Sequence, residues 1–299
     1  MIKKTTLLRI TLVAIMLLVV YYLFGVEELL KTPKARPYRN LPDFSAKYNV
    51  DEEVRAALAR MRTDKALAPV VSSNLSVDGL KVALTFDGLT DARQMEKLLN
   101  LLKQYNMKAT FFVDALQTSE NPQLVKNIRD QGHKVENYTF SGSTNMQNLS
   151  AQRLVTDFCR AQKIIEVETG ITPTLLKCND TQYTDELLMA ARACGFEGVV
   201  QSNIYLNTEE INKIGSADQF VQSFAPGSIV SVKLLPYPED NKPAESVTAS
   251  RPAVDKQPSL GLPDREVAGP DAMIVNAVEK LLLSMEKAHY ESFYMQVTH

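Results

Sequence analysis

The sequence has no tryptophan, little glycine and only three cysteines among its 299 residues. Three cysteines are too few for a disulfide framework, and Cys159, Cys178 and Cys194 lack the spacing of a metal-binding motif. Two arrangements fit this count: one bridge with one free thiol, or three buried thiols. Three buried thiols is the simpler interpretation.

Histidine is also scarce, and positive charges do not outnumber negative ones. The three histidines, His133, His289 and His299, include no pair with the spacing of metal ligands. The net charge of −2 argues against nucleic acid as the main partner, because nucleic-acid binding usually needs a basic surface. The apolar fraction of 45% is enough for a sizeable core, so we expect a globular protein.

Residues 7–26 form an apolar run that contains Arg9 near its start. Twenty helical residues span roughly 30 Å, about the hydrocarbon thickness of a bilayer. Lys3 and Lys4 precede the run, which predicts a cytoplasmic stub at 1–6 and an extracytoplasmic remainder. A cleaved signal peptide is the alternative, but the run is long and no small-x-small cleavage site follows it. We therefore expect a single-pass anchor in the cell membrane.

Residues 27–79 are mostly polar and are interpreted as a tether. Within it, residues 51–66 are typical of a short amphipathic helix, with Val54, Leu58 and Met61 on one face. A globular domain is predicted from 80 to 299. Its segment 236–270 is rich in proline, serine and charge and lacks apolar periodicity, which predicts a disordered insertion.

Short apolar runs alternate with helical patterns through this domain. Strands are predicted at 82–86, 109–113, 174–176, 198–201, 229–232 and 292–297, and helices at 91–105, 122–129, 150–168, 185–193 and 272–287. This alternation favours an α/β fold with parallel strands. Chemistry in βα barrels lies at the carboxyl ends of the strands, where this sequence has Asp87, Lys177 and Lys233.

Several of these segments carry a family resemblance. Residues 84–88, Leu-Thr-Phe-Asp-Gly, resemble the Thr-Phe-Asp-Asp-Gly signature of the polysaccharide deacetylase family (NodB-homology, carbohydrate esterase family four). Further similar segments lie at 108–113, 132–137, 184–196 and 227–230. The resemblance implies a distorted (β/α) barrel, here preceded by one transmembrane helix. It also implies that the ligand is an N-acetylated cell-wall polysaccharide.

The residues at the family's metal-binding and catalytic positions differ in this sequence. Family members hold a divalent metal such as zinc with an Asp-His-His triad, whose positions fall here on Gly88, Tyr138 and Gly142. The positions of the catalytic base, the third-motif arginine, the orienting aspartate and the catalytic histidine fall on Asp87, Lys177, Asn207 and Lys233. Glycine offers no ligand and a neutral tyrosine is a poor one. We therefore expect no metal cofactor.

Asp87 has two interpretations, a retained general base or an ion pair with Lys177 or Lys233, and the ion pair is favoured. Two function classes remain open. The favoured one is a non-catalytic envelope protein that binds carbohydrate or a partner. The other is a hydrolase that removes N-acetyl groups through an atypical site, and the candidate replacement carboxylates are Asp91, Asp114 and Glu136. The aromatic side chains near the motif positions that could stack on a sugar are Tyr138, Phe140, Tyr183 and Tyr205.

Overall fold

The computed structural model describes residues 47–72, 75–213, 215–234 and 270–295, which belong to one compact unit. The predicted anchor at 7–26 lies outside the described residues, as do the start of the tether and nearly all of the predicted insertion at 236–270. Within the described ranges, none of the helices combines the length and the apolar character that crossing a membrane requires.

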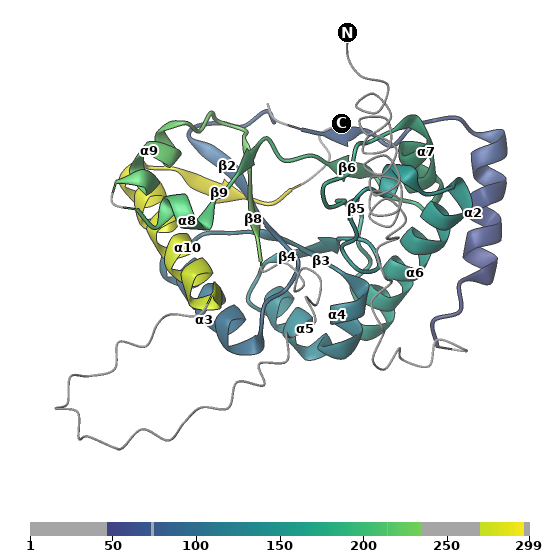
Figure 1. Ribbon diagram of the computed structural model, residues 1–299, viewed down its shortest axis with the longest axis horizontal. Helices are drawn as coiled ribbons and strands as arrows, with labels where there is room; N and C mark the ends of the chain where they lie inside the picture. Colours follow the sequence, from purple (N-terminus) through teal and green to yellow (C-terminus); the bar gives the residue numbers. More distant parts are fainter. Residues whose placement is uncertain (1–46, 73–74, 214, 235–269, 296–299) are drawn as a thin grey trace, which may run out of the picture. The chain divides into compact units, whose positions relative to one another are not determined.

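The strands that the structure describes form one parallel sheet in the order β1-β6-β5-β4-β3-β2-β8-β7, and β9 pairs with the first residues of β2. The sheet curls into a half-barrel (Figure 1), and no pairing between described residues joins β1 to β7 to close the barrel that the sequence predicted. The bounds are β1 Val70–Val71, β2 Lys81–Asp87, β3 Thr110–Val113, β4 Lys134–Asn137, β5 Leu175–Leu176, β6 Gly198–Val200, β7 Ile204–Tyr205, β8 Ile229–Lys233 and β9 Glu291–Phe293.

Helices surround the outside of this curled sheet, with α8, α9 and α10 towards one end and α2, α6 and α7 towards the other (Figure 1). The helical bounds are α2 Asp51–Thr63, α3 Ala92–Gln104, α4 Ala115–Glu120, α5 Pro122–Asp130, α6 Ala151–Thr169, α7 Asp185–Ala193, α8 Thr208–Ile211, α9 Ser216–Gln222 and α10 Pro270–Lys287, with the 3₁₀ turn η1 at Met146–Asn148.

The central strand β2 explains how the sheet positions polar groups. Alternate side chains of a strand point to opposite faces. Leu84 and Phe86 join the core beneath the outer helices, whereas Ala83 joins the cluster on the inner face of the sheet. Thr85 and Asp87 continue the inner row. The strand thus ends with a carboxylate on the concave side.

The helix predicted at 51–66 is confirmed as α2, but the domain boundary predicted at residue 80 is wrong. Ala57 and Met61 of α2 are buried against α6 and α7, and β1 extends the sheet by pairing Val70 with Val199 of β6. The apolar face that the sequence assigned to a tether helix is therefore covered by the domain itself. Burial of that face explains why the helix is part of the fold.

Candidate functional site

The structure brings the three polar residues predicted at strand ends into one cleft. Asp87 is the last residue of β2, Lys177 directly follows β5, and Lys233 is the last residue of β8. The cleft has a volume of about 120 Å³. Sites for drug-sized ligands usually measure ~300–1,000 Å³, so this cleft is small and suits one substituent of a larger ligand.

A buried ion pair forms the floor of the cleft. Lys177 Nζ lies 2.7 Å from Asp87 Oδ1, and the Ser231 hydroxyl donates to Asp87 Oδ2 at 2.6 Å. The ammonium group also donates to Ser202 Oγ at 2.7 Å. The Asp87 and Lys177 residues are each only 3% exposed, so these contacts replace water for both charges. Burial lowers the pKa of Lys177, and the Asp87 carboxylate opposes that change.

The ion pair between Asp87 and a lysine, which the sequence favoured, is therefore present, and its partner is Lys177. Lys233 instead lies at the rim, where its Nζ is 3.0 Å from Oδ1 of Asp180. Both side chains of this second pair are largely exposed, so solvent screens their attraction.

Tyrosine side chains and a thiol make up much of the remaining wall. Burial raises the pKa of Tyr138 and of Cys178, so both keep their protons at neutral pH. The Tyr183 hydroxyl donates to the carbonyl of Val200 at 2.8 Å and accepts the Cys178 N–H at 3.2 Å. Tyr205 is 52% exposed, which leaves its ring accessible at the mouth of the cleft.

Two non-glycine residues beside the cleft have left-handed backbones. Thr139 follows Tyr138 at φ +68°, and Asp180 has φ +35°. This region is strongly disfavoured for a β-branched residue such as threonine. The Thr139 N–H donates to Oδ1 of Asn137 at 2.6 Å, and its Oγ1 accepts the N–H of Gly142 at 3.1 Å. Such strained positions cluster at functional sites, where surrounding contacts hold them in place.

Other predicted site residues lie outside the cleft. Asn207 caps α8, because its Oδ1 accepts the Glu210 N–H at 3.2 Å. Gly88, the glycine after Asp87, has φ +88°, and its N–H donates to the carbonyl of Phe112 in β3 at 2.8 Å. Gly142 and Phe140 are not among the cleft's lining residues, and the carbonyl of Gly142 accepts from the Asn179 amide at 3.0 Å.

The three candidate replacement carboxylates have structural partners elsewhere. Asp91 and Asp114 accept backbone N–H groups at the first turns of α3 and α4. Glu136 forms an ion pair with Lys134 at 2.8 Å and accepts two backbone N–H groups from the chain entering β5. In the part of the chain that the structure describes, no three His, Cys, Asp or Glu side chains form a group that could hold a metal ion.

Sequence reasoning missed three hydroxyl residues that complete the floor, Thr85, Ser202 and Ser231. A signal for two of them was available. Thr85 precedes Asp87 by two residues, and Ser231 precedes Lys233 by two, so each shares the inner face of its strand with a predicted residue. Ser202 lies after β6 in a loop, where no periodic pattern applies.

A family model described as polysaccharide deacetylase matches residues 76–199, the segment from just before β2 into β6. It includes Asp87 and Lys177 but ends before Lys233. The chain is also 30% identical over 121 residues to a peptidoglycan-N-acetylglucosamine deacetylase of Bacillus cereus, covering 40% of this chain and 56% of that protein. From β2 into β6 the chain is therefore similar to polysaccharide deacetylases.

The chain is also similar to a second deacetylase and to two solved structures. Peptidoglycan-N-acetylmuramic acid deacetylase PdaA of Bacillus subtilis is 24% identical over 152 residues, covering 50% of this chain and 57% of that protein. The chain therefore spans little more than half the length of both deacetylases. A CE4 family pseudoenzyme from Bacillus anthracis has a TM-score of 0.57 at 16% identity, covering 80% of this chain and 78% of that one. A family 4 carbohydrate esterase from Streptomyces lividans, solved with acetate, has a TM-score of 0.55 at 18% identity over 74% and 95%. At these identities the two structures show a shared fold.

Proposed function

We propose that this chain is a non-catalytic member of the polysaccharide deacetylase family that binds N-acetylated cell-wall polysaccharide in the Asp87 cleft. One observation carries the proposal: both oxygens of the Asp87 carboxylate are already bound, one by the Lys177 ammonium and the other by the Ser231 hydroxyl. A carboxylate held in this way is a weak proton acceptor, because proton transfer to it would leave a buried ammonium unpaired.

The donor set in the described part of the cleft does not fit a divalent metal. Such a metal needs anionic or imidazole ligands. Asp87 is paired with Lys177, and Asp180 is paired with Lys233 at the rim. The other groups that could lose a proton to bind a metal keep it at neutral pH, because burial raises the pKa of each; they are Tyr138, Cys178, Tyr183 and Tyr205. A buried ammonium on the cleft floor also repels a dication at close range.

The cleft suits a neutral acetamido group. Hydroxyl and amide groups can exchange hydrogen bonds with that substituent, the volume admits one group of this size, and the exposed ring of Tyr205 offers an apolar face to the sugar. Two relatives are named as deacetylases of peptidoglycan, whose sugars carry this group. One solved relative is described as a CE4 family pseudoenzyme, and a mutant of it as having restored enzymatic activity.

The test compares binding and catalysis on the same glycan. We expect the full-length chain to bind N-acetylated peptidoglycan, to bind its chemically de-N-acetylated form more weakly, and to release no acetate with or without zinc, cobalt or nickel. Tyr205→Ala should weaken binding roughly 2- to 10-fold, the equivalent of the extra ~0.5–1.5 kcal/mol of an aromatic contact. Tyr294→Ala, which removes another exposed tyrosine outside the cleft, is the matched control.

Two results would overturn the proposal. Acetate release above that of a heat-inactivated sample, lost in Asp87→Asn, would show a working hydrolase. Equal binding to both forms of the glycan would remove the acetamido group as the recognised feature. A variant carrying Gly88→Asp, Tyr138→His and Gly142→His tests metal binding separately, since it restores the three ligand types at the family positions.

We also propose that residues 7–26 anchor the protein in the cell membrane, with the domain outside. The length of the apolar run and the preceding lysines support this. Protease added to intact cells should then digest the domain while the protein stays with the membrane fraction. Protection of the domain from protease, or its recovery in the soluble fraction, would contradict the proposal.

A further inference from the structure

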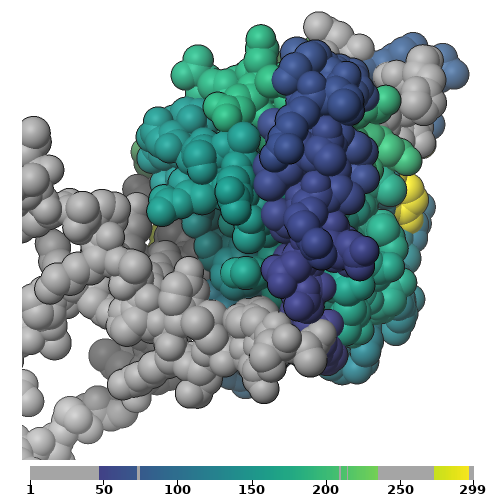
Figure 2. Space-filling model, turned by 90° about the vertical axis from the view of Figure 1, so that its right-hand side faces the viewer, coloured from purple at the N-terminus to yellow at the C-terminus, as the bar shows by residue number. Residues whose placement is uncertain are grey.

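The structure contains a second, larger pocket on the outer side of the sheet, remote in sequence from Asp87. It has a volume of about 420 Å³ and lies between α2, α6 and α7. In Figure 2 the purple helix α2 lies along the surface of the teal helices beside it. Nothing in the proposed glycan site uses this pocket.

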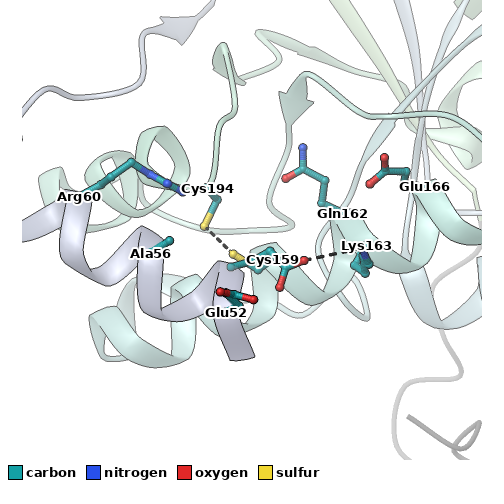
Figure 3. Close-up of a pocket in the computed structure, with 9 residues that line it drawn as sticks. Glu52, Ala56, Arg60, Cys159, Gln162, Lys163, Glu166 and Cys194 are labelled. Carbon is teal, nitrogen blue, oxygen red and sulfur yellow. Dashed lines mark hydrogen bonds and ion pairs between the residues drawn. The ribbon is translucent and has the colours of Figure 1, made fainter. Parts of the chain in front are cut away.

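Two thiols face each other at this pocket. Cys159 comes from the middle of α6, and Cys194 ends α7. Their Sγ atoms are 3.4 Å apart, and the close-up in Figure 3 shows the two thiols pointing toward each other beside Arg60. A disulfide has an S–S distance of ~2.0 Å, so closure needs the two sulfurs to approach by about 1.4 Å.

We propose that Cys159 and Cys194 form a reversible intramolecular disulfide by exchange with a small disulfide compound that enters this pocket. Three observations support the assignment: the sulfurs are in contact, the thiols line an open pocket, and Arg60 lies beside them. Two hydrogen bonds hold the Arg60 guanidinium in this position: its Nε donates to the carbonyl of Ala193 at 2.8 Å, and a terminal nitrogen donates to the same oxygen at 2.5 Å.

The surroundings assign different roles to the two thiols. The hydrogen bond with Cys194 lowers the pKa of Cys159; burial and the Glu53 carboxylate oppose this change, and the Arg60 guanidinium adds to it. The hydrogen bond with Cys159 and burial raise the pKa of Cys194. Thiolates rather than thiols attack disulfides. Cys159 is therefore the attacking group, and Cys194 is the resolving group.

The exchange balances in two steps. The Cys159 thiolate attacks one sulfur of the small disulfide, which forms a mixed disulfide and releases one thiolate. Cys194 loses its proton and attacks the Cys159 sulfur, which forms the internal bond and releases the second thiol. The two cysteines are oxidised, and the small disulfide is reduced to two thiols. The charged side chains that line the pocket carry both signs, so a zwitterionic disulfide such as cystine matches them; they are Arg60, Lys163, Glu52, Glu53 and Glu166, and Lys163 is paired with Glu53 at 3.6 Å.

The bridge would also close a loop of the chain that contains residues of the glycan cleft. Cys159 and Cys194 are 35 positions apart, and Lys177 and Tyr183 lie between them. A loop of this length gives a substantial loss of unfolded-state entropy. For a domain of this size, closure should raise the melting temperature by roughly 5–15 °C.

The experiment incubates the reduced, purified full-length chain with cystine and then counts free thiols and maps disulfide-linked peptides. We expect the wild type to fall from three free thiols to one, to lose about 2 Da, and to yield one linked pair, Cys159 with Cys194. Cys178→Ser should form the same pair, whereas Cys159→Ser and Cys194→Ser should form no internal bridge. Dithiothreitol should reverse the reaction and the rise in melting temperature.

Several outcomes would overturn the proposal. They are three free thiols after cystine treatment, a linked peptide that contains Cys178, or a bridge between two chains. Bridge formation without a rise in melting temperature would show that the bond does not fit the native arrangement of α6 and α7. Because peptide mapping uses the wild type, the test does not depend on the variants folding, and it reports nothing about glycan binding.

Discussion

Lys177→Met removes the ammonium that holds the Asp87 carboxylate, and this substitution tests the structure of the cleft floor most directly. Methionine keeps much of the length of the lysine chain, so the change mainly removes charge and hydrogen bonds. Breaking a buried ion pair by removing one partner costs ~3–5 kcal/mol, because the other charge stays buried and unpaired. We expect Lys177→Met to lower the free energy of unfolding by about this amount at pH 7, measured by urea unfolding.

Two further variants make the measurement specific. Lys233→Met removes the exposed lysine of the rim pair, and it should cost no more than about 1 kcal/mol. The double variant Asp87→Asn with Lys177→Met leaves no unpaired charge on the floor. Its loss should therefore be smaller than the sum of the two single losses by about 2–3 kcal/mol, within the range found for residues in contact. Two results would refute the reasoning: a Lys177→Met loss in the free energy of unfolding no greater than that of Lys233→Met, or a double-variant loss equal to the sum of the two single losses.

Three other predictions concern stability away from the floor. Burial lowers the pKa of His133 to about 4, so its contribution to the free energy of unfolding is kept above pH 6.5 and lost as pH falls from 6.5 to 4. His133→Phe should remove about 3 kcal/mol of this loss, so the free energy of unfolding, measured by chemical unfolding, should depend less on pH than in the wild type. Parallel pH profiles would contradict the assignment. Gly227→Ala should lower the melting temperature more than Gly170→Ala. Both glycines have positive φ, but a Cβ at 227 would lie 2.1 Å from the carbonyl oxygen of Leu75. Equal losses of melting temperature would argue against that close approach. Asp91→Ala should cost about 1 kcal/mol through loss of the α3 N-cap and leave glycan affinity unchanged, and a large loss of affinity would instead place Asp91 in the site.

Long periodic segments of the fold could be predicted from the sequence. The predicted helix at 91–105 is α3, and the one at 150–168 is α6, which ends at Gly170 with φ +73° as a C-terminal glycine should. The strand predicted at 82–86 is β2. These elements bury one regular face, so their apolar spacing is visible without tertiary information.

Shorter elements were missed for a physical reason. The helices α4 and α9 have six and seven residues, and β7 has two, which is too short for an apolar period to repeat. The strand predicted at 292–297 starts near β9 at Glu291–Phe293, and its last residues lie outside the described ranges. Such elements form because neighbouring strands and helices supply their partners.

The candidate site divides in the same way. Asp87, Lys177 and Lys233 were found because strands end at them, which depends on local pattern alone. Which lysine binds Asp87 was left open, because the answer depends on where the β5 and β8 ends meet across the curled sheet. Asp180, which binds Lys233, lies in an irregular turn, and no periodic pattern in the sequence predicts its position.

The pairing of β2 has a consequence for the order in which the molecule can assemble during synthesis. Only Thr85–Asp87 of β2 pair early, with β3; β9, which pairs with Lys81–Ala83, and β8, which pairs with Ala83–Asp87, follow much later, and Ser231 is 144 positions beyond Asp87. Contacts of such sequence separation form slowly. A growing chain that has reached only β6 therefore carries an apolar central strand with one open edge, a known route to aggregation. The carboxyl-terminal third acts as a built-in closing element, and truncation before Ile229 should yield insoluble protein.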